Sequence, residues 1–187
     1  MPVDQPQTGP RNTDLPARWL LSDKRNDHRL ERLLRNARTR IGFVYRHYHL
    51  PPEARIARFE VLQRICRLRG HLVILADSAL PAREWGADGI YGAPLTLSPR
   101  RAGLVSIATV HDMREIVQAC RMRADAAMLS PAFVTRSHPG ADVLGPSRFR
   151  LMARHARMPV IALGGMSHHR AAHMRWPRWA AIDGFDR

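Results

Sequence analysis

The sequence predicts an α/β fold, a compact (β/α)8 or TIM barrel, from three observations. Short, mainly apolar runs of strand character alternate with stretches whose apolar residues recur at helical spacing. There are eight such runs, the number that closes a parallel barrel with its helices outside. The repeating units are short, which favours a compact barrel. A doubly wound open sheet is the alternative, but no G-x-G-x-x-G motif follows the first run.

Each expected strand is a short run of mainly apolar residues. The third run, LVILAD, and the seventh, PVIALGG, are apolar for most of their length, as strands buried on both faces are. The eight expected strands span residues 19–23, 41–48, 72–77, 88–92, 104–110, 126–130, 159–165 and 179–183.

The expected helices repeat their apolar residues every three or four positions. Residues 28–38 do so, and the next helix begins at Pro51, carries its apolar residues on one side and ends at Gly70. The remaining expected helices span residues 80–85, 112–121, 147–157 and 167–174. Because the sequence reaches Arg187 soon after the eighth strand, we expect a barrel that lacks its last helix. A partner in a homo-oligomer could cover the apolar surface that this exposes.

The composition indicates one domain with a short polar extension. At 187 residues the chain is long enough to bury one sizeable core. Residues 1–14 are rich in proline, glycine and polar residues and are expected to form a flexible N-terminal tail before the barrel domain at 15–187. The tail lacks the apolar centre of a signal peptide, and no apolar run approaches the roughly 20 residues of a membrane span, so no membrane partner is expected. Two cysteines without a C-x-x-C motif favour a reduced, cytoplasmic protein.

The net charge of +14 suggests a nucleic-acid partner at first sight. Lys24 is the only lysine among 30 basic residues, and the arginines are scattered from Arg11 to Arg187 without a single basic tract. Aromatic residues are few, and no nucleic-acid-binding motif is present. We therefore expect only nonspecific, salt-sensitive attraction to polyanions and no specific nucleic-acid partner.

Anion-binding groups follow two successive expected strands. Thr135, Arg136 and a further serine and histidine come after the sixth strand, and Gly164-Gly165 ends the seventh. Hydroxyls, a cation and flexible backbone amides suit an anion, and phosphate is the first candidate. In a parallel barrel both loops lie on the carboxyl-end face, where such barrels place their chemistry.

Several motifs of the chain, taken together, resemble thiamine phosphate synthase and its relative TenI, a thiazole tautomerase. The matching segments are VYRHY at 44–48, LAD at 75–77, ADGIYG at 87–92, TVHDMREI at 109–116, SPAFVTRSHPGA at 130–141 and VIALGG at 160–165. The last two blocks are the most specific. The similarity extends over residues 15–185 and implies a TIM barrel, in agreement with the eight-strand pattern.

The resemblance is incomplete on the half of the site that handles pyrophosphate. The synthase joins hydroxymethylpyrimidine diphosphate to thiazole phosphate, releases pyrophosphate and requires Mg²⁺. Of the family's Gln-x-Arg-x-Lys signature on strand two, this chain keeps only Arg46. Asp77 is a possible metal ligand after strand three, but Thr96 stands where a second carboxylate is expected. A single carboxylate is expected to hold a hard dication weakly.

The part of the family's site that binds thiazole phosphate is better retained in this sequence. The resemblance implies that loop hydroxyls, glycine N–H groups and the ends of strands five and eight contact the ligand. These substrate-binding residues are Thr109, Thr135, Ser137, His138, Gly164, Gly165 and Gly184. Asp183 would repel a phosphate unless a nearby arginine compensates its charge. After strand five, His111 and Glu115 match a histidine and a helix glutamate of the family. In TenI this histidine moves a proton while the thiazole carboxylate phosphate becomes aromatic, and it needs no Mg²⁺.

The retained residues suit a tautomerase better than a synthase, and a TenI-like tautomerase is the leading hypothesis. His111 would be the acid–base group, because imidazole titrates near neutral pH, and Arg46 would steer the substrate carboxylate. One alternative is a thiamine phosphate synthase that uses Mg²⁺, with Arg46 and Asp77 as its remaining contacts. The other is a non-catalytic binder of a phosphate ligand, or a regulator.

Several of these residues also have a purely structural interpretation. His111 could cap the helix that starts at Asp112, and Asp77 could cap the helix that follows it. Tyr45 and Tyr48 could be packing residues or form a stacking wall for a heteroaromatic ring. The three histidines of the last expected helix fit a solvated helix face better than a metal site, because no carboxylate or cysteine lies near them in the sequence.

Overall fold

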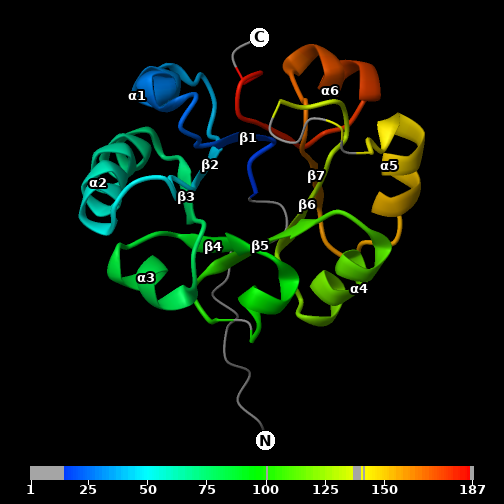
Figure 1. Ribbon diagram of the computed structural model, residues 1–187, viewed down its shortest axis with the longest axis horizontal. Coiled ribbons are helices and arrows are strands. Elements are labelled where there is room, and N and C mark those ends of the chain that lie inside the picture. Colours follow the sequence, from blue (N-terminus) through cyan, green and yellow to red (C-terminus); the bar gives the residue numbers. More distant parts are fainter. Residues whose placement is uncertain (1–14, 100, 137–139, 141, 186–187) are drawn as a thin grey trace, which may run out of the picture.

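The computed structural model is a closed barrel of eight parallel strands surrounded by helices (Figure 1). It describes residues 15–185 except 100, 137–139 and 141. Each strand is hydrogen-bonded to the next one in the chain, and β8 pairs with β1 to close the ring. The predicted TIM barrel is confirmed, and the closure rules out the open-sheet alternative.

All eight expected strands and all six expected helices are present. The strands are β1 Arg18–Leu21, β2 Gly42–Tyr45, β3 Leu72–Leu75, β4 Gly89–Gly92, β5 Val105–Val110, β6 Ala126–Leu129, β7 Val160–Ala162 and β8 Trp179–Ala181. The helices are α1 Asp27–Asn36, α2 Pro52–Arg69, α3 Ala79–Glu84, α4 Met113–Arg121, α5 Gly145–Ala153 and α6 His168–Met174. After β4 the chain forms only a 3-10 helix, η1 (Pro94–Leu97), and within the described residues no helix follows β8. None of the described helices is long and apolar enough to cross a membrane.

The inside of the barrel is a packed apolar core. Trp19 of β1 is fully buried there, and two glycines leave room for bulky neighbours. A Cβ atom on Gly42 would lie 2.1 Å from the Trp19 ring, and one on Gly89 would lie 2.2 Å from the carbonyl oxygen of Val105. The remaining interior is filled mainly by aliphatic side chains and methionine, among them Val44, Ile74, Ile107, Met128 and Ile161. Side chains therefore fill the interior of the barrel, and a ligand can bind only at an end of it.

A second apolar layer lies between the barrel and its helices. Tyr45 of β2 points outward and packs edge-on against Phe59 of α2, with ring centroids 5.3 Å apart. Leu30 and Leu34 of α1 are fully buried in the same layer. This layer fixes the helices on the strands, and with them the loops that begin each helix.

The C-terminal segment runs through the gap between α6 and α1 (Figure 1). Phe185 is buried there, its ring centroid lies 6.0 Å from that of Trp179, and the guanidinium of Arg18 lies over it. Phe185 thus covers part of the apolar surface beside β8, where the sequence predicted that a last helix would be missing.

Strand β2 is shorter than predicted. The expected strand ran to residue 48, but β2 ends at Tyr45. His47 has a positive φ of 34°, a left-handed conformation that cannot continue a strand. The N–H of Arg46 is bound by the side chain of Ser22 instead of a neighbouring strand. The expected strand included Arg46, His47 and Tyr48, but the backbone turns immediately after Arg46.

Candidate active site at the carboxyl end of the barrel

A cavity of about 940 Å³ opens at the carboxyl ends of the strands. Parallel barrels place their binding groups on this face, because its loops can vary without disturbing the strands. Most of the predicted site residues lie in the cavity wall. These are Arg46, Thr109, His111, Thr135, Gly164, Gly165 and Gly184. Ser137 and His138 lie outside the described residues, and Asp77 is not among those that line the cavity.

The described wall of the cavity is strongly cationic. It contains five arginines and a single carboxylate, that of Asp183. The arginines come from the β1–α1 loop, α1, the end of β2, the β6–α5 loop and α6, and they are Arg25, Arg29, Arg46, Arg136 and Arg170. Fixed cations around a concave site favour anionic ligands over neutral ones. The predicted anion specificity therefore agrees with the charge of the described wall.

Gly164 and Gly165 form a turn that only glycine can make at this place. Both have positive φ, 93° and 60°, and a Cβ atom on Gly165 would lie 2.3 Å from the carbonyl oxygen of Val134. The loop after β6 is bonded to this turn, since the N–H of Phe133 donates to the carbonyl of Gly164 over 3.0 Å. No acceptor for the N–H groups of the two glycines is found among the described residues. The turn can therefore offer both N–H groups to a bound phosphate, as the sequence predicted.

Arg170 of α6 adds a cation beside this glycine turn. Its guanidinium donates to the carbonyl oxygen of Gly165 and lies over the Phe133 ring, 5.0 Å from the ring centroid. It also lines the cavity. A guanidinium held in this way retains further N–H donors for a phosphate oxygen.

The carboxylate of Asp183 has its charge balanced within the protein. Arg25 lies 3.2 Å from it and is also bonded to Asp23 over 2.8 Å. Although burial alone would raise the pKa of the Asp23 carboxyl, its bonds to Arg25 lower it. The compensating arginine that the sequence argument required is thus Arg25. The neighbouring Gly184 is needed for close packing, because a Cβ atom there would lie 2.4 Å from the carbonyl oxygen of Met166.

His111 is held at the cavity wall by a glutamate of the following helix. Its Nδ1 lies 2.9 Å from the Glu115 carboxylate, which also accepts the backbone N–H of His111 over 2.6 Å. Because the carboxylate can only accept, Nδ1 donates and Nε2 is the nitrogen left for a ligand. The ring is about half exposed, at 54%. The capping interpretation of His111 is wrong, since Asp112 caps α4 by accepting the N–H of Glu115.

Thr109 of β5 lies two residues before His111 in the sequence, and its side chain contacts that of Tyr91 on β4. The two side chains are hydrogen-bonded, and burial raises the pKa of the Tyr91 phenol above its usual value. Both line the cavity. They supply neutral hydroxyl groups to a cavity wall that also carries charged side chains.

Arg46 and Tyr48 line the cavity from the end of β2. Within the described part of the chain the guanidinium of Arg46 has no bonded partner, so it can serve a ligand. Tyr48 is 64% exposed, and the guanidinium of Arg55 lies 5.4 Å from its ring centroid. Tyr45 belongs to the apolar layer between the barrel and its helices, where its hydroxyl donates to the carbonyl of Arg55 over 2.8 Å. Tyr48 is thus placed where a stacking wall could form, and Tyr45 is a packing residue.

The family model of thiamine monophosphate synthase, which also covers TenI, matches residues 20–180. The chain belongs to this family. It is 29% identical over 135 residues to a thiamine-phosphate synthase of Chloroflexus aurantiacus, a match that covers 68% of this chain and 62% of that protein. It is 33% identical over 119 residues to one of Chlorobium luteolum, over 60% of this chain and 56% of that protein. The chain thus spans less than two thirds of the length of these curated relatives.

The fold agrees with solved structures of other proteins that superpose over most of this chain. Thiamine phosphate pyrophosphorylase from Pyrococcus furiosus superposes with a TM-score of 0.74 and 20% identity, over 90% of this chain and 88% of that one. FabK from Thermotoga maritima superposes with a TM-score of 0.69 and 14% identity, over 91% of this chain and 59% of that one. At such identities the superpositions show the common barrel fold and nothing about the ligand.

The Mg²⁺ that the family implies does not fit the residues present here. The Asp77 carboxylate is bound by Arg55 over 2.7 Å and by the N–H of Ser78 over 2.8 Å. The hydroxyl of Thr96 donates to the carbonyl of Ala93. Among the described residues no three histidine, cysteine or acidic side chains come together as a metal site. Asp77 also makes no cap bond to α3, whose N-terminal cap is Ser78.

Sequence reasoning missed two arginines of the cavity wall and one ion pair outside it. Arg170 lies in the first turn of the helix that follows Gly165, and its proximity to a glycine turn was the available signal. Arg25 lies in the first strand-to-helix loop, which in a barrel opens on the same face as the other loops. The partner of Asp77, Arg55, is 22 residues earlier in α2, and no local pattern indicated that pairing.

Proposed function

We propose that the cavity binds a thiazole phosphate that carries a carboxylate, and that His111 transfers the proton that makes its ring aromatic. The activity is that of a TenI-like thiazole tautomerase. The observation that carries the proposal is the position of His111, oriented by Glu115, on the wall of a cationic cavity that also contains the Gly164-Gly165 turn. Family membership supports the thiazole phosphate ligand but does not choose the reaction.

The phosphate would be held by the loops that follow β6 and β7. Gly164 and Gly165 offer N–H groups, Arg170 offers a guanidinium, and Thr135 lies in the same wall. Charge-assisted hydrogen bonds of this kind are about twice as strong as neutral ones. The strong bonds would thus be made to a part of the ligand that does not react.

The proton transfer would use Nε2 of His111. This nitrogen, as the free base, removes a proton from the ring carbon that carries the carboxylate, and the resulting imidazolium gives a proton to the exocyclic carbon of the conjugated system. Negative charge develops on the carboxylate as the first proton leaves. Arg46 stabilises that charge from the end of β2, and the Glu115 carboxylate stabilises the transient imidazolium. No metal ion takes part in these steps.

Thiamine phosphate synthase is the second candidate, and it is favoured by the relatives from Chloroflexus aurantiacus and Chlorobium luteolum, which are thiamine-phosphate synthases. In this case Arg46 would contact the pyrophosphate of the pyrimidine substrate, and Mg²⁺ would have to be carried mainly by that substrate, because Arg55 binds Asp77. A binder or regulator without turnover is the third candidate.

We place the protein in the reducing cytoplasm, since both of its cysteines are free thiols and burial raises the pKa of Cys66 to about 12.

Two assays on the full chain separate these functions. The first follows conversion of the non-aromatic thiazole carboxylate phosphate into its aromatic tautomer, with and without EDTA. We expect turnover that EDTA does not affect. The second mixes hydroxymethylpyrimidine diphosphate, thiazole phosphate and Mg²⁺ and measures pyrophosphate. Rapid, EDTA-sensitive release would establish the synthase, and tight thiazole phosphate binding without either reaction would establish the binder.

A further inference from the structure

Two partly buried chains of hydrogen bonds meet at the backbone of Arg46. On one side, its N–H donates to the hydroxyl oxygen of Ser22 over 2.7 Å. On the other side, its carbonyl oxygen accepts from Nε of Arg55 over 3.2 Å. The guanidinium of Arg46 itself lines the cavity and has no bonded partner among the described residues. The peptide units on both sides of this residue are thus fixed while its charge is left for a ligand.

The first chain of hydrogen bonds runs through His47. The hydroxyl of Ser22 lies 2.8 Å from Nδ1 of His47, and Nε2 of His47 lies 2.9 Å from the carboxylate of Asp27. Since the carboxylate can only accept, Nε2 donates, and Nδ1 of a neutral ring accepts the Ser22 proton. All donors therefore point the same way, from Arg46 through Ser22 and His47 to Asp27. Ser22 is fully buried, and His47 is 1% exposed.

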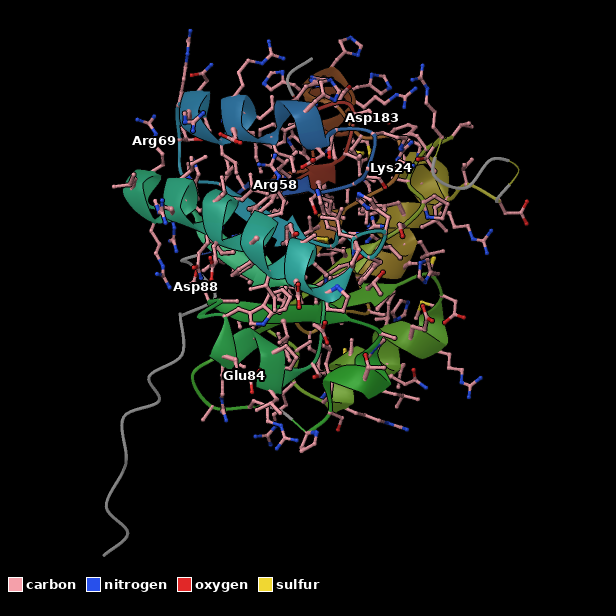
Figure 2. The ribbon with its side chains drawn as sticks, turned by 60° about the vertical axis from the view of Figure 1, so that its left-hand side comes forward. Lys24, Arg58, Arg69, Glu84, Asp88 and Asp183 are labelled. Atoms are coloured by element: carbon pink, nitrogen blue, oxygen red, sulfur yellow. The ribbon has the colours of Figure 1, made fainter. Side chains whose placement is uncertain are left out.

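The far end of this chain is fixed by an arginine between α1 and α2 (Figure 2). Arg58 donates from Nε to the Asp27 carboxylate over 2.9 Å and from Nη1 to Glu31 over 2.8 Å. Burial alone would raise the pKa of Asp27, but the bonds from His47 and Arg58 lower it, so the carboxylate stays ionised. The acceptor at the end of the chain is thus a stable charge.

The second chain of hydrogen bonds runs through Arg55, whose side chain is only 13% exposed. Besides the carbonyl of Arg46, its guanidinium binds the Asp77 carboxylate over 2.7 Å and the carbonyl of Ala76 over 3.2 Å. It also lies over the rings of Tyr48 and Trp85, 5.4 and 5.2 Å from their centroids. Arg55 therefore joins the carboxyl end of β2 to that of β3. Asp77, which the family resemblance assigns to a metal, anchors this arginine.

The backbone of His47 is held in a strained conformation by its side-chain contacts. Its φ of 34° is unfavourable for a residue with a side chain, and such conformations persist only where the surroundings enforce them. Here the two ring nitrogens of His47 are bonded on opposite sides, and the ring stacks on Tyr45 at 4.8 Å. The side-chain contacts enforce the turn that ends β2 directly after Arg46.

We propose that His47 and Arg55 are positioning residues, which hold Arg46 so that its guanidinium meets the carboxylate of the ligand. The proposal rests on the proposed function for the identity of that carboxylate. It also predicts a pH dependence. A protonated His47 would donate from Nδ1, and the buried hydroxyl of Ser22 would lose its acceptor. The charged and titratable groups around the ring are Tyr45, Asp27, His49 and Arg58. Burial lowers the pKa of His47 below its usual value.

The test compares two ligands, thiazole carboxylate phosphate and thiazole phosphate, because only the first has a group for Arg46. A hydrogen bond between charged groups contributes about 1.5–3 kcal/mol, so the wild type should bind the first roughly 10–100-fold more tightly. Arg46→Gln should remove this preference. His47→Asn should reduce it about threefold or more near pH 7.5, because asparagine tolerates the left-handed backbone but cannot bridge Ser22 and Asp27. Lowering the pH should reduce the preference in the wild type and much less in His47→Asn.

The matched control is His71→Asn. His71 is also a buried histidine, bonded to the carbonyl of Leu34 over 3.0 Å, but it lies at the amino end of β3, away from the cavity. The His71→Asn substitution should lower the free energy of unfolding and leave the preference for thiazole carboxylate phosphate unchanged. In the Arg46→Gln background, His47→Asn should have no further effect on the preference. An unchanged preference in His47→Asn, or a loss that persists in this background, would overturn the proposal.

Hydrogen exchange gives a readout that needs no ligand. In His47→Asn the backbone amide of Arg46 should exchange at least about tenfold faster, because its acceptor Ser22 is no longer held. Unchanged exchange at Arg46 would refute the positioning role. If the wild type binds neither ligand, the proposed function fails, and the exchange result still decides whether His47 holds Arg46.

Discussion

Replacing Gly165 by alanine should disturb the Gly164-Gly165 turn far more than a typical glycine substitution would. The new Cβ atom would lie 2.3 Å from the carbonyl oxygen of Val134 and 3.0 Å from Cβ of Phe133. Both belong to the loop after β6, which is bonded to the glycine turn. The guanidinium of Arg170, 2.9 Å away, can move aside, but the backbone oxygen cannot move without moving the loop.

The magnitude follows from comparison with Gly70, which ends α2. Gly70 has a similar φ of 69°, but a Cβ atom there would meet nothing within 4 Å. Gly70→Ala therefore measures only the left-handed backbone, which costs about 1–2 kcal/mol. Gly165→Ala adds the overpacking, which typically costs about 1–3 kcal/mol more. We expect it to lower the free energy of unfolding by about 2–5 kcal/mol in total.

Urea unfolding and calorimetric titration with thiazole phosphate check both consequences. Displacing the loop also displaces the N–H donors of the glycine turn, and losing one hydrogen bond to a charged phosphate should weaken binding roughly tenfold or more. Gly70→Ala should bind normally, because it lies at the opposite end of the barrel. If Gly165→Ala were no less stable than Gly70→Ala and bound thiazole phosphate as the wild type does, the phosphate would not lie at this turn.

Three further outcomes are expected. Arg170→Met keeps apolar contact with Phe133 but removes the cation, so thiazole phosphate should bind about tenfold more weakly and with less salt dependence, as titrations at two ionic strengths would show. Burial lowers the pKa of His47 and His71, so the unfolded chain takes up protons first as the pH falls. Their contribution to stability is fully present above about pH 6.5 and is lost as the pH falls through their folded-state pKa values, which urea unfolding at several pH values would detect. DNA should bind weakly, without sequence preference, and dissociate at physiological salt; a sequence-selective complex in a mobility-shift assay at that salt would contradict this.

The barrel could be predicted because its evidence is local. Each strand is an apolar run of a few residues, and each helix shows the repeat that places one face on the core. The end of β2 was predicted wrongly because the expected strand was extended through Arg46 and His47 to Tyr48, whereas the chain leaves the strand after Tyr45. The cause is the left-handed backbone of His47, which depends on Ser22 and Asp27 from other elements. No local pattern in the sequence reports such contacts.

The site was predicted in part for the same reason. Gly164, His111 and Arg46 stand at strand ends that the motifs mark, and all three line one cavity. The interactions that determine what these residues can do are not local. The pairing of Arg55 with Asp77 spans 22 residues and removes the carboxylate that the family pattern offers to a metal. Such pairings become visible only when the strands have been placed side by side.

The most direct test of the account is to replace His111 by asparagine and measure tautomer conversion and ligand binding together. Asparagine keeps a polar side chain but cannot exchange a proton near neutral pH. The rate should fall about 10²–10⁴-fold, and thiazole phosphate should bind as before, because its phosphate is held by loops after other strands. His155→Asn, at an exposed histidine outside the described cavity wall, should change neither. If the wild type converts the tautomer and His111→Asn does so equally fast, His111 is not the catalyst and the central claim is wrong.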